Sequence, residues 1–99
     1  MNISFSKSAI DDLESVKEYY HEQGVPRIGK NFVVAIVEHI ETLVAHPDIG
    51  RVVPEFGDES IRELIHSQFR VVYLRESESI NIIRVWRSER LLKLPGNGV

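Results

Sequence analysis

The chain has 99 residues, of which 42% are apolar and 27% are charged, and it contains no cysteine. This length suits one domain with one modest core, so we treat residues 1–99 as a single domain with a loosely held tail, 92–99. The lack of cysteine excludes a disulfide framework, a zinc–thiolate site and a thiol nucleophile. No secretory leader and no run of roughly 18 apolar residues occurs, so we expect a cytoplasmic protein that does not span a membrane.

The formal net charge of −3 hides a difference between the two parts of the chain. Residues 1–60 hold five Lys and Arg against eleven Asp and Glu, whereas residues 61–99 hold seven against four. This asymmetry indicates either a C-terminal surface that faces an acidic partner or arginines on solvated strand edges. The sequence pI of about 5.8 lacks the strongly basic character of a dedicated nucleic-acid-binding protein.

The beginning of the chain predicts a strand that leads directly into a helix. Residues 2–6 alternate polar and apolar side chains, which is typical of a short strand. Ser6 or Ser8 can cap the helix that follows. We expect Asp11 and Asp12 in its first turn, where the helix dipole favours acidic side chains.

A second helix is predicted from about Pro26 to His46, after a break at Gly24. Its apolar residues recur at helical spacing and predict a stripe that faces the core: Ile28, Phe32, Ile36, Ile40 and Leu43. A second apolar row lies beside this stripe: Val33, Val37 and Val44. Either both rows are core, one against the sheet and one against the first helix, or the second row binds a partner.

The remainder predicts an extended, turn-rich loop over 46–60 and then three strands, at 61–66, 69–75 and 79–87. The short polar connections between these strands predict an antiparallel meander. The element order is therefore β-α-α-β-β-β. We predict an α+β fold in which an N-terminal strand and an α-helical hairpin accompany a small antiparallel sheet, with the hairpin packed on one face.

The histidines give no sign of a metal site. They are His21, His39, His46 and His66, and no two of them have the i,i+4 spacing of a zinc-binding helix. We expect all four to be solvated. No glycine-rich phosphate loop and no nucleophile elbow occurs either, so we predict no metal and no cofactor.

The arginines of the second half are more informative. Those of interest here lie in the predicted strands or at their ends: Arg62, Arg70, Arg84, Arg87 and Arg90. A guanidinium group offers a fixed fork of donors that pairs with phosphate or carboxylate at two points. Beside Trp86 and Tyr73, such a cluster can hold a phosphodiester and stack a base, grip acidic side chains of a protein, or pair with acids of the first half.

Three segments of the C-terminal half carry a resemblance to a known family. They are Ile61-Arg62-Glu63-Leu64, Phe69-Arg70-Val71-Val72-Tyr73 and the stretch from Val85 to Arg90. Together with the element order and the helix exit "HPDIGRVVPEF", they resemble the RelE/ParE superfamily of bacterial toxins over about residues 2–92. The resemblance implies the toxin of a type II toxin–antitoxin pair, held inactive in a hetero-oligomeric complex with a cognate antitoxin.

The same resemblance implies two alternative activities on one fold. RelE-like members cut messenger RNA on the ribosome, whereas ParE-like members poison DNA gyrase and block replication. The residues available to a RelE-like reaction are Arg70 and Arg90 for the phosphate, and Glu55, Glu63, His66 or Tyr73 as acid or base. The tyrosine or histidine that RelE-like enzymes carry near the C-terminus is missing here, and the acidic pI suits ribosome binding poorly. Both features favour the ParE-like branch.

We therefore predict a ParE-like gyrase inhibitor that serves plasmid or prophage maintenance and need not be an enzyme. The predicted target-binding residues are Arg84, Trp86, Arg87 and Arg90. The predicted antitoxin-binding residues are Val33, Val37 and Val44. Two alternatives remain, a ribosome-dependent endoribonuclease and an inactive toxin relative that serves as an antitoxin-binding module.

Overall fold

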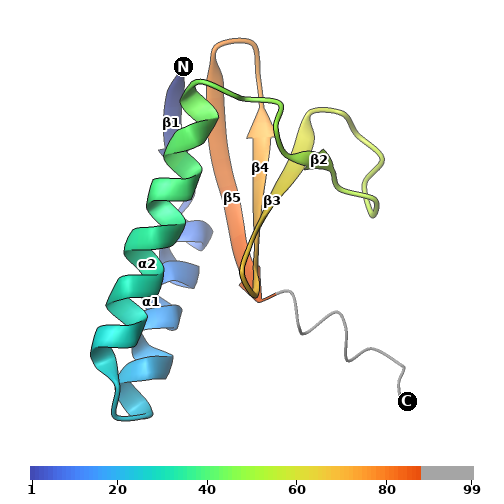
Figure 1. The fold of residues 1–99 in the computed structure, drawn as a ribbon. Helices are drawn as coiled ribbons and strands as arrows, with labels where there is room; N and C mark the ends of the chain where they lie inside the picture. Colours follow the sequence, from blue (N-terminus) through green and yellow to red (C-terminus); the bar gives the residue numbers. More distant parts are fainter. Residues whose placement is uncertain (88–99) are drawn as a thin grey trace.

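The computed structural model describes residues 1–87, which form a sheet with a helical hairpin against it (Figure 1). The elements are β1 (Asn2–Phe5), α1 (Lys7–Glu22), α2 (Pro26–Glu41), a 3₁₀ helix η1 (Thr42–Val44), β2 (Arg51–Val52), β3 (Ile61–His66), β4 (Phe69–Arg75) and β5 (Ser79–Arg87). The predicted order and the α+β class are confirmed. Strand β2 is an addition inside the segment that was expected to be loop, and the predicted tail 92–99 lies outside the described residues.

The five strands form one sheet in the order β1-β5-β4-β3-β2. Strands β3, β4 and β5 make the predicted antiparallel meander, and their bounds agree with the prediction. Strand β1 instead runs parallel to β5, with Asn2 opposite Ser79 and Phe5 opposite Ile82. The sheet is therefore mixed rather than antiparallel throughout. The long chain between β1 and β5 makes a parallel pairing possible, because no tight turn joins the two strands.

Helix α1 begins earlier than the position of its acids suggested. Ser6 is the N-cap, and its side-chain oxygen accepts a hydrogen bond from the backbone N–H of Ala9 at 3.0 Å. The helix starts at Lys7, so Asp11 and Asp12 lie beyond the first turn and the expected contact with the helix dipole is wrong. Asp12 is used differently, as described below.

Helix α2 begins at Pro26 as predicted but ends at Glu41, five residues before the expected end. The chain tightens there into the 3₁₀ helix η1. The hydroxyl of Thr42 donates to the carbonyl of His39 at 2.6 Å, which satisfies one of the acceptors that a helix C-terminus leaves open.

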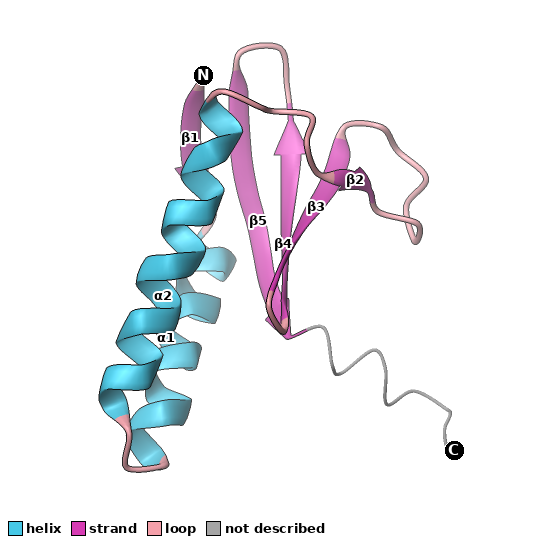
Figure 2. Ribbon diagram, in the orientation of Figure 1, coloured by secondary structure: helices cyan, strands magenta, loops and turns pink. Residues whose placement is uncertain are grey.

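The hairpin covers one face of the sheet, where α1 contacts β1 and β5 and α2 contacts β3, and it leaves β2 uncovered (Figures 1 and 2). The core between the layers is apolar: Leu13 and Val16 from α1, Ile36 and Ile40 from α2, Leu43 from η1, and Val71, Tyr73, Ile80, Ile82 and Val85 from the sheet. Most of the predicted α2 stripe is therefore core. Ile28 is the exception, because it lies in the first turn of α2, near the end of the hairpin that extends beyond the strands.

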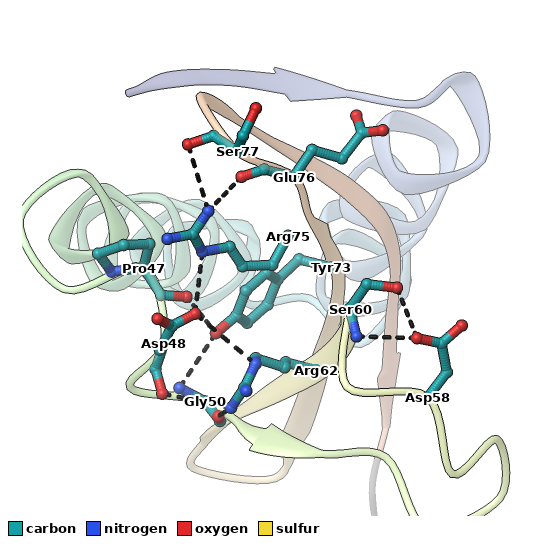
Figure 3. Close-up of polar contacts among 10 residues, drawn as sticks. All are labelled: Pro47, Asp48, Gly50, Asp58, Ser60, Arg62, Tyr73, Arg75, Glu76 and Ser77. Carbon is teal, nitrogen blue, oxygen red and sulfur yellow. Dashed lines mark hydrogen bonds and ion pairs between the residues drawn. The ribbon is translucent and has the colours of Figure 1, made fainter.

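The loop that leads from η1 to β3 is held on the sheet by polar contacts (Figure 3). The buried Tyr73 hydroxyl donates to the carbonyl of Pro47 at 2.9 Å and accepts from the N–H of Gly50 at 3.0 Å. Arg75 Nε donates to Asp48 at 2.9 Å. A side chain at Gly50 would meet the Tyr73 hydroxyl at 2.6 Å, so this close approach requires glycine.

Candidate target-binding surface

The C-terminal end of β5 carries two cation–π pairs. The guanidinium carbon of Arg84 lies 5.1 Å from the ring centroid of Trp86, on the same strand. The guanidinium carbon of Arg87 lies 5.2 Å from the ring centroid of Tyr19, on α1. Three of the four predicted target-binding residues thus lie together at this end of the strand, and the fourth, Arg90, lies outside the described residues. The pairs hold aromatic and cationic planes against one another.

Asp12 of α1 fixes the position of Arg84. Its Oδ2 accepts from Arg84 Nε at 2.8 Å, and its Oδ1 accepts from Arg84 Nη2 at 2.9 Å. The backbone N–H of Val85 donates to the same Oδ2 at 2.8 Å. Asp12 therefore accepts a backbone N–H at the edge of β5, beyond the residues that pair with β1. The hydrogen bond to Asp12 also raises the pKa of Arg84. Sequence reasoning missed this residue, because the two partners lie 72 positions apart.

A groove of about 310 Å³ opens between α1 and the end of β5. Tyr19, Phe69 and Trp86 contribute aromatic surface to its lining, and Arg84 and Arg87 contribute guanidinium groups. Such a lining can stack a planar group and pair with a carboxylate or a phosphate. The groove is thus suited to an anionic or aromatic side chain of a partner.

The sheet face turned away from the hairpin carries a ladder of four charged side chains: Arg51, Glu63, Arg70 and Glu55. Glu63 accepts from the Nε of Arg51 and from the Nε of Arg70, both at 2.6 Å. Arg70 also donates from Nη1 and Nη2 to the two oxygens of Glu55, each at 3.2 Å. The middle of the ladder is buried, with Glu63 1% exposed and Arg70 4% exposed.

The ladder sets the charge state of its members. The hydrogen bond from Arg70 lowers the pKa of Glu55. Burial acts to lower the pKa of Arg70, but its hydrogen bonds to Glu55 and Glu63 outweigh burial and raise it. Glu55 and Arg70 are therefore held in their ionised forms, and three N–H donors of Arg70 are already used within the protein.

The remaining candidates for RelE-like acid–base chemistry lie on the opposite side of the sheet from the ladder. Tyr73 is fully buried in the core, and burial raises the pKa of its hydroxyl. His66 contacts His39 of α2, with the two Nδ1 atoms 2.9 Å apart. The expectation that these two histidines are solvated is wrong, because both are partly buried between α2 and β3. The structure thus brings Glu55, Glu63 and Arg70 together as ion pairs and places Tyr73 and His66 elsewhere.

The valine row predicted to bind the antitoxin is divided by the fold. Val33 and Val37 are partly buried and pack against the core, so they lie largely inside the hairpin–sheet contact. Val44 of η1 is 49% exposed. On α2, Ile28 and Val34 add exposed apolar surface, at 44% and 56%. Apolar surface available to a partner is thus present on this helix and on η1, with Val44 as the accessible member of the predicted row.

Among residues 1–87, no group of three or more histidine, cysteine, aspartate or glutamate side chains is arranged to hold a metal ion. Within the same range, no helix has the length and apolar character needed to cross a membrane.

The order of the elements, with a helical hairpin on one face of a sheet that ends in an antiparallel meander, is the architecture that the resemblance to the RelE/ParE superfamily implies. The family model described as "ParE toxin of type II toxin-antitoxin system, parDE" matches residues 3–92, and the chain belongs to this family. A solved structure titled "Chromosomal ParDE TA system from P. aeruginosa" is similar, with 26% sequence identity and a TM-score of 0.72. The match covers 88% of this chain and 95% of that one. A search of curated proteins gives no match.

Proposed function

We propose that this ParE toxin inhibits DNA gyrase in the cytoplasm, blocks replication and is neutralised by a cognate antitoxin. One structural observation favours gyrase over the ribosome. The arginine that the ribonuclease alternative requires for the phosphate, Arg70, is buried and committed to Glu63 and Glu55. Arg84, Trp86 and Arg87 form the arginine–tryptophan end of β5. This surface is more accessible, because the Arg84 side chain is 38% exposed even though its Nε and Nη2 donate to Asp12.

The chemistry of this surface suits a protein partner with acidic or aromatic side chains. Arg84 and Arg87 supply cations on a chain whose net charge is −3, so the attraction they exert is local. Gyrase poisoning needs a surface that grips the enzyme and needs no acid–base pair in the toxin. Trp86 and Tyr19 add the aromatic area that commonly anchors protein interfaces.

The first test is to induce this chain alone in bacteria and to follow thymidine and leucine incorporation side by side. We expect thymidine incorporation to fail first and the cells to form filaments. With purified gyrase and supercoiled plasmid, we expect loss of supercoiling and accumulation of linear DNA. Earlier loss of leucine incorporation would instead support the ribosome-dependent ribonuclease, and normal growth would support an inactive relative kept as an antitoxin-binding module.

Two substitutions locate the target-binding surface. Trp86→Ala removes the largest aromatic side chain of the groove, and Arg90→Glu reverses the charge of the predicted residue beyond β5. We expect each to lose gyrase inhibition while circular dichroism shows an unchanged fold. Ile49→Asp, in an exposed loop position, is the control and should stay toxic. Full inhibition by both β5-end variants would contradict the assignment.

Antitoxin binding is proposed over the exposed side of α2 and η1, where Val44 is the accessible member of the predicted row of Val33, Val37 and Val44. Val44→Asp is the informative change, because Val44 is half exposed while Val37 packs against the core. We expect Val44→Asp to weaken co-purification with the antitoxin, and Ile49→Asp to leave it unchanged. Equal recovery of the antitoxin with both variants would place the interface elsewhere.

A further inference from the structure

His39 and His66 form a contact that has no role in the gyrase inhibition proposed above. His39 lies in the last turn of α2, and His66 is the last residue of β3. Their Nδ1 atoms are 2.9 Å apart and their ring centroids 5.1 Å apart, with the planes inclined by 56°. Both side chains are partly buried, in contrast to the exposed His21 and His46. Two imidazoles from separate elements thus place the same ring nitrogen, Nδ1, within hydrogen-bonding distance of each other.

We propose that His39 and His66 form a binding site for a late first-row divalent transition-metal ion, with Cu²⁺ as the ion held most tightly. Neutral imidazole nitrogen is the commonest protein ligand for such ions. Nitrogen sites generally bind Cu²⁺ more strongly than Ni²⁺ or Zn²⁺. The ion would join α2 to β3 at a place where the two elements are otherwise in limited contact.

The separation of the two nitrogens fits a shared ion. Two nitrogens that each lie about 2.05 Å from one metal are about 2.9 Å apart when the angle at the metal is near 90°, and about 3.3 Å apart at a tetrahedral angle. The observed 2.9 Å corresponds to neighbouring positions of a square-planar or octahedral ion. Cu²⁺ and Ni²⁺ prefer square-planar or tetragonal geometry, whereas structural zinc prefers tetrahedral sites.

The protonation of the pair is compatible with metal binding. Without an ion, one Nδ1 carries the proton that the other accepts. When the metal ion binds, the ring that carried its proton on Nδ1 must carry it on Nε2 instead. The proton moves from Nδ1 to Nε2 through solvent. Both Nδ1 lone pairs then face the metal, with no change in oxidation state.

The remaining coordination positions are open to water or to a partner. Residues 1–87 contain no group of three or more metal-ligating side chains, so this part of the chain supplies two ligands here. His66 also borders a mostly apolar groove of about 280 Å³, with Ile28, Asn31, Phe32 and Ala35. An ion at this place would therefore lie beside a surface that a partner can reach.

The experiment is a titration of the purified, untagged chain, stripped of metal, with Cu²⁺, Ni²⁺ and Zn²⁺ separately, followed by calorimetry and by thermal unfolding. Copper electron paramagnetic resonance reports nitrogen ligands directly. The variants are His39→Asn and His66→Gln, which keep a polar side chain, and the matched controls are His21→Ala and His46→Ala, which remove exposed histidines.

We expect the wild-type chain to bind one Cu²⁺ more tightly than Ni²⁺ or Zn²⁺, with nitrogen hyperfine splitting and a raised unfolding temperature. Either site variant should weaken Cu²⁺ binding about 100-fold, because a single imidazole loses the benefit of two linked ligands. Both controls should bind as the wild type does. Binding that is unchanged in the two site variants, or no saturation at one ion, would overturn the proposal and leave a plain hydrogen bond between the rings.

Discussion

Removal of the Glu63 carboxylate tests whether the charged ladder holds the sheet together. In Glu63→Ala, the Nε–H of Arg70 loses its partner in a place where the Arg70 side chain is only 4% exposed. Arg51 also loses its contact, but its side chain is 65% exposed and water can replace the carboxylate. The main cost is thus an arginine left partly unpaired inside the protein.

The loss of unfolding free energy in Glu63→Ala depends on how many hydrogen bonds Arg70 keeps. Breaking a buried ion pair by removing one partner costs about 3–5 kcal/mol, because the other charge stays buried. Glu55 still accepts two hydrogen bonds from Arg70, so we expect the lower end, about 3 kcal/mol. For a domain of this size, that corresponds to a fall of about 15 °C in the unfolding temperature.

The assay is urea and thermal unfolding followed by circular dichroism, with two comparison variants. Glu55→Ala removes an exposed carboxylate and should cost far less than Glu63→Ala. Glu63→Leu combined with Arg70→Met replaces the buried pair by apolar side chains of similar size, and should lie within about 1 kcal/mol of the wild type. The reasoning is refuted if Glu63→Ala is no more costly than Glu55→Ala, or if the double variant is as unstable as the single one.

Three further changes test contacts elsewhere in the fold. Gly50→Ala should cost about 2 kcal/mol in urea unfolding, because the new Cβ would meet the Tyr73 hydroxyl at 2.6 Å. Tyr73→Phe should also cost about 2 kcal/mol, by leaving the Gly50 N–H unsatisfied. Burial raises the folded-state pKa of Tyr73 above 10.0, so its protonated form contributes stability below pH 10 that is lost at higher pH. The phenylalanine variant should lack that part of the alkaline loss. Asp12→Asn should cost about 1 kcal/mol after allowance for solvent screening, and less in 1 M salt.

The helices and strands could be predicted because the sequence patterns that mark them lie within each element. Strands β3, β4 and β5 have the predicted bounds, since apolar alternation and short polar turns mark each end. The parallel pairing of β1 with β5 leaves no such mark, because Asn2 and Ser79 belong to opposite ends of the chain. The early end of α2 coincides with a hydrogen bond from Thr42 to the carbonyl of His39, which helical periodicity does not reveal.

The sequence predicted which residues form the candidate site, but it did not predict which side chains they contact. The cluster of arginines with Trp86 was visible in the sequence, and the fold places Arg84 against Trp86. That Asp12 would hold Arg84, and that Glu63 and Glu55 would occupy Arg70, depends on contacts between separate elements. The pairing of His39 with His66 is of the same kind, because 27 residues separate them.

The ladder also bears on which of the two family activities this chain can support. To hold a scissile phosphate, Arg70 would have to leave Glu55 or Glu63. Glu63 has no exposed side-chain surface, so its carboxylate would then lie buried beside the phosphate, and two like charges would repel in a place with little solvent to screen them. The same sheet face thus resists an anionic substrate at Arg70. This agrees with the proposal that the toxin acts through Arg84, Trp86 and Arg87 at the accessible end of β5.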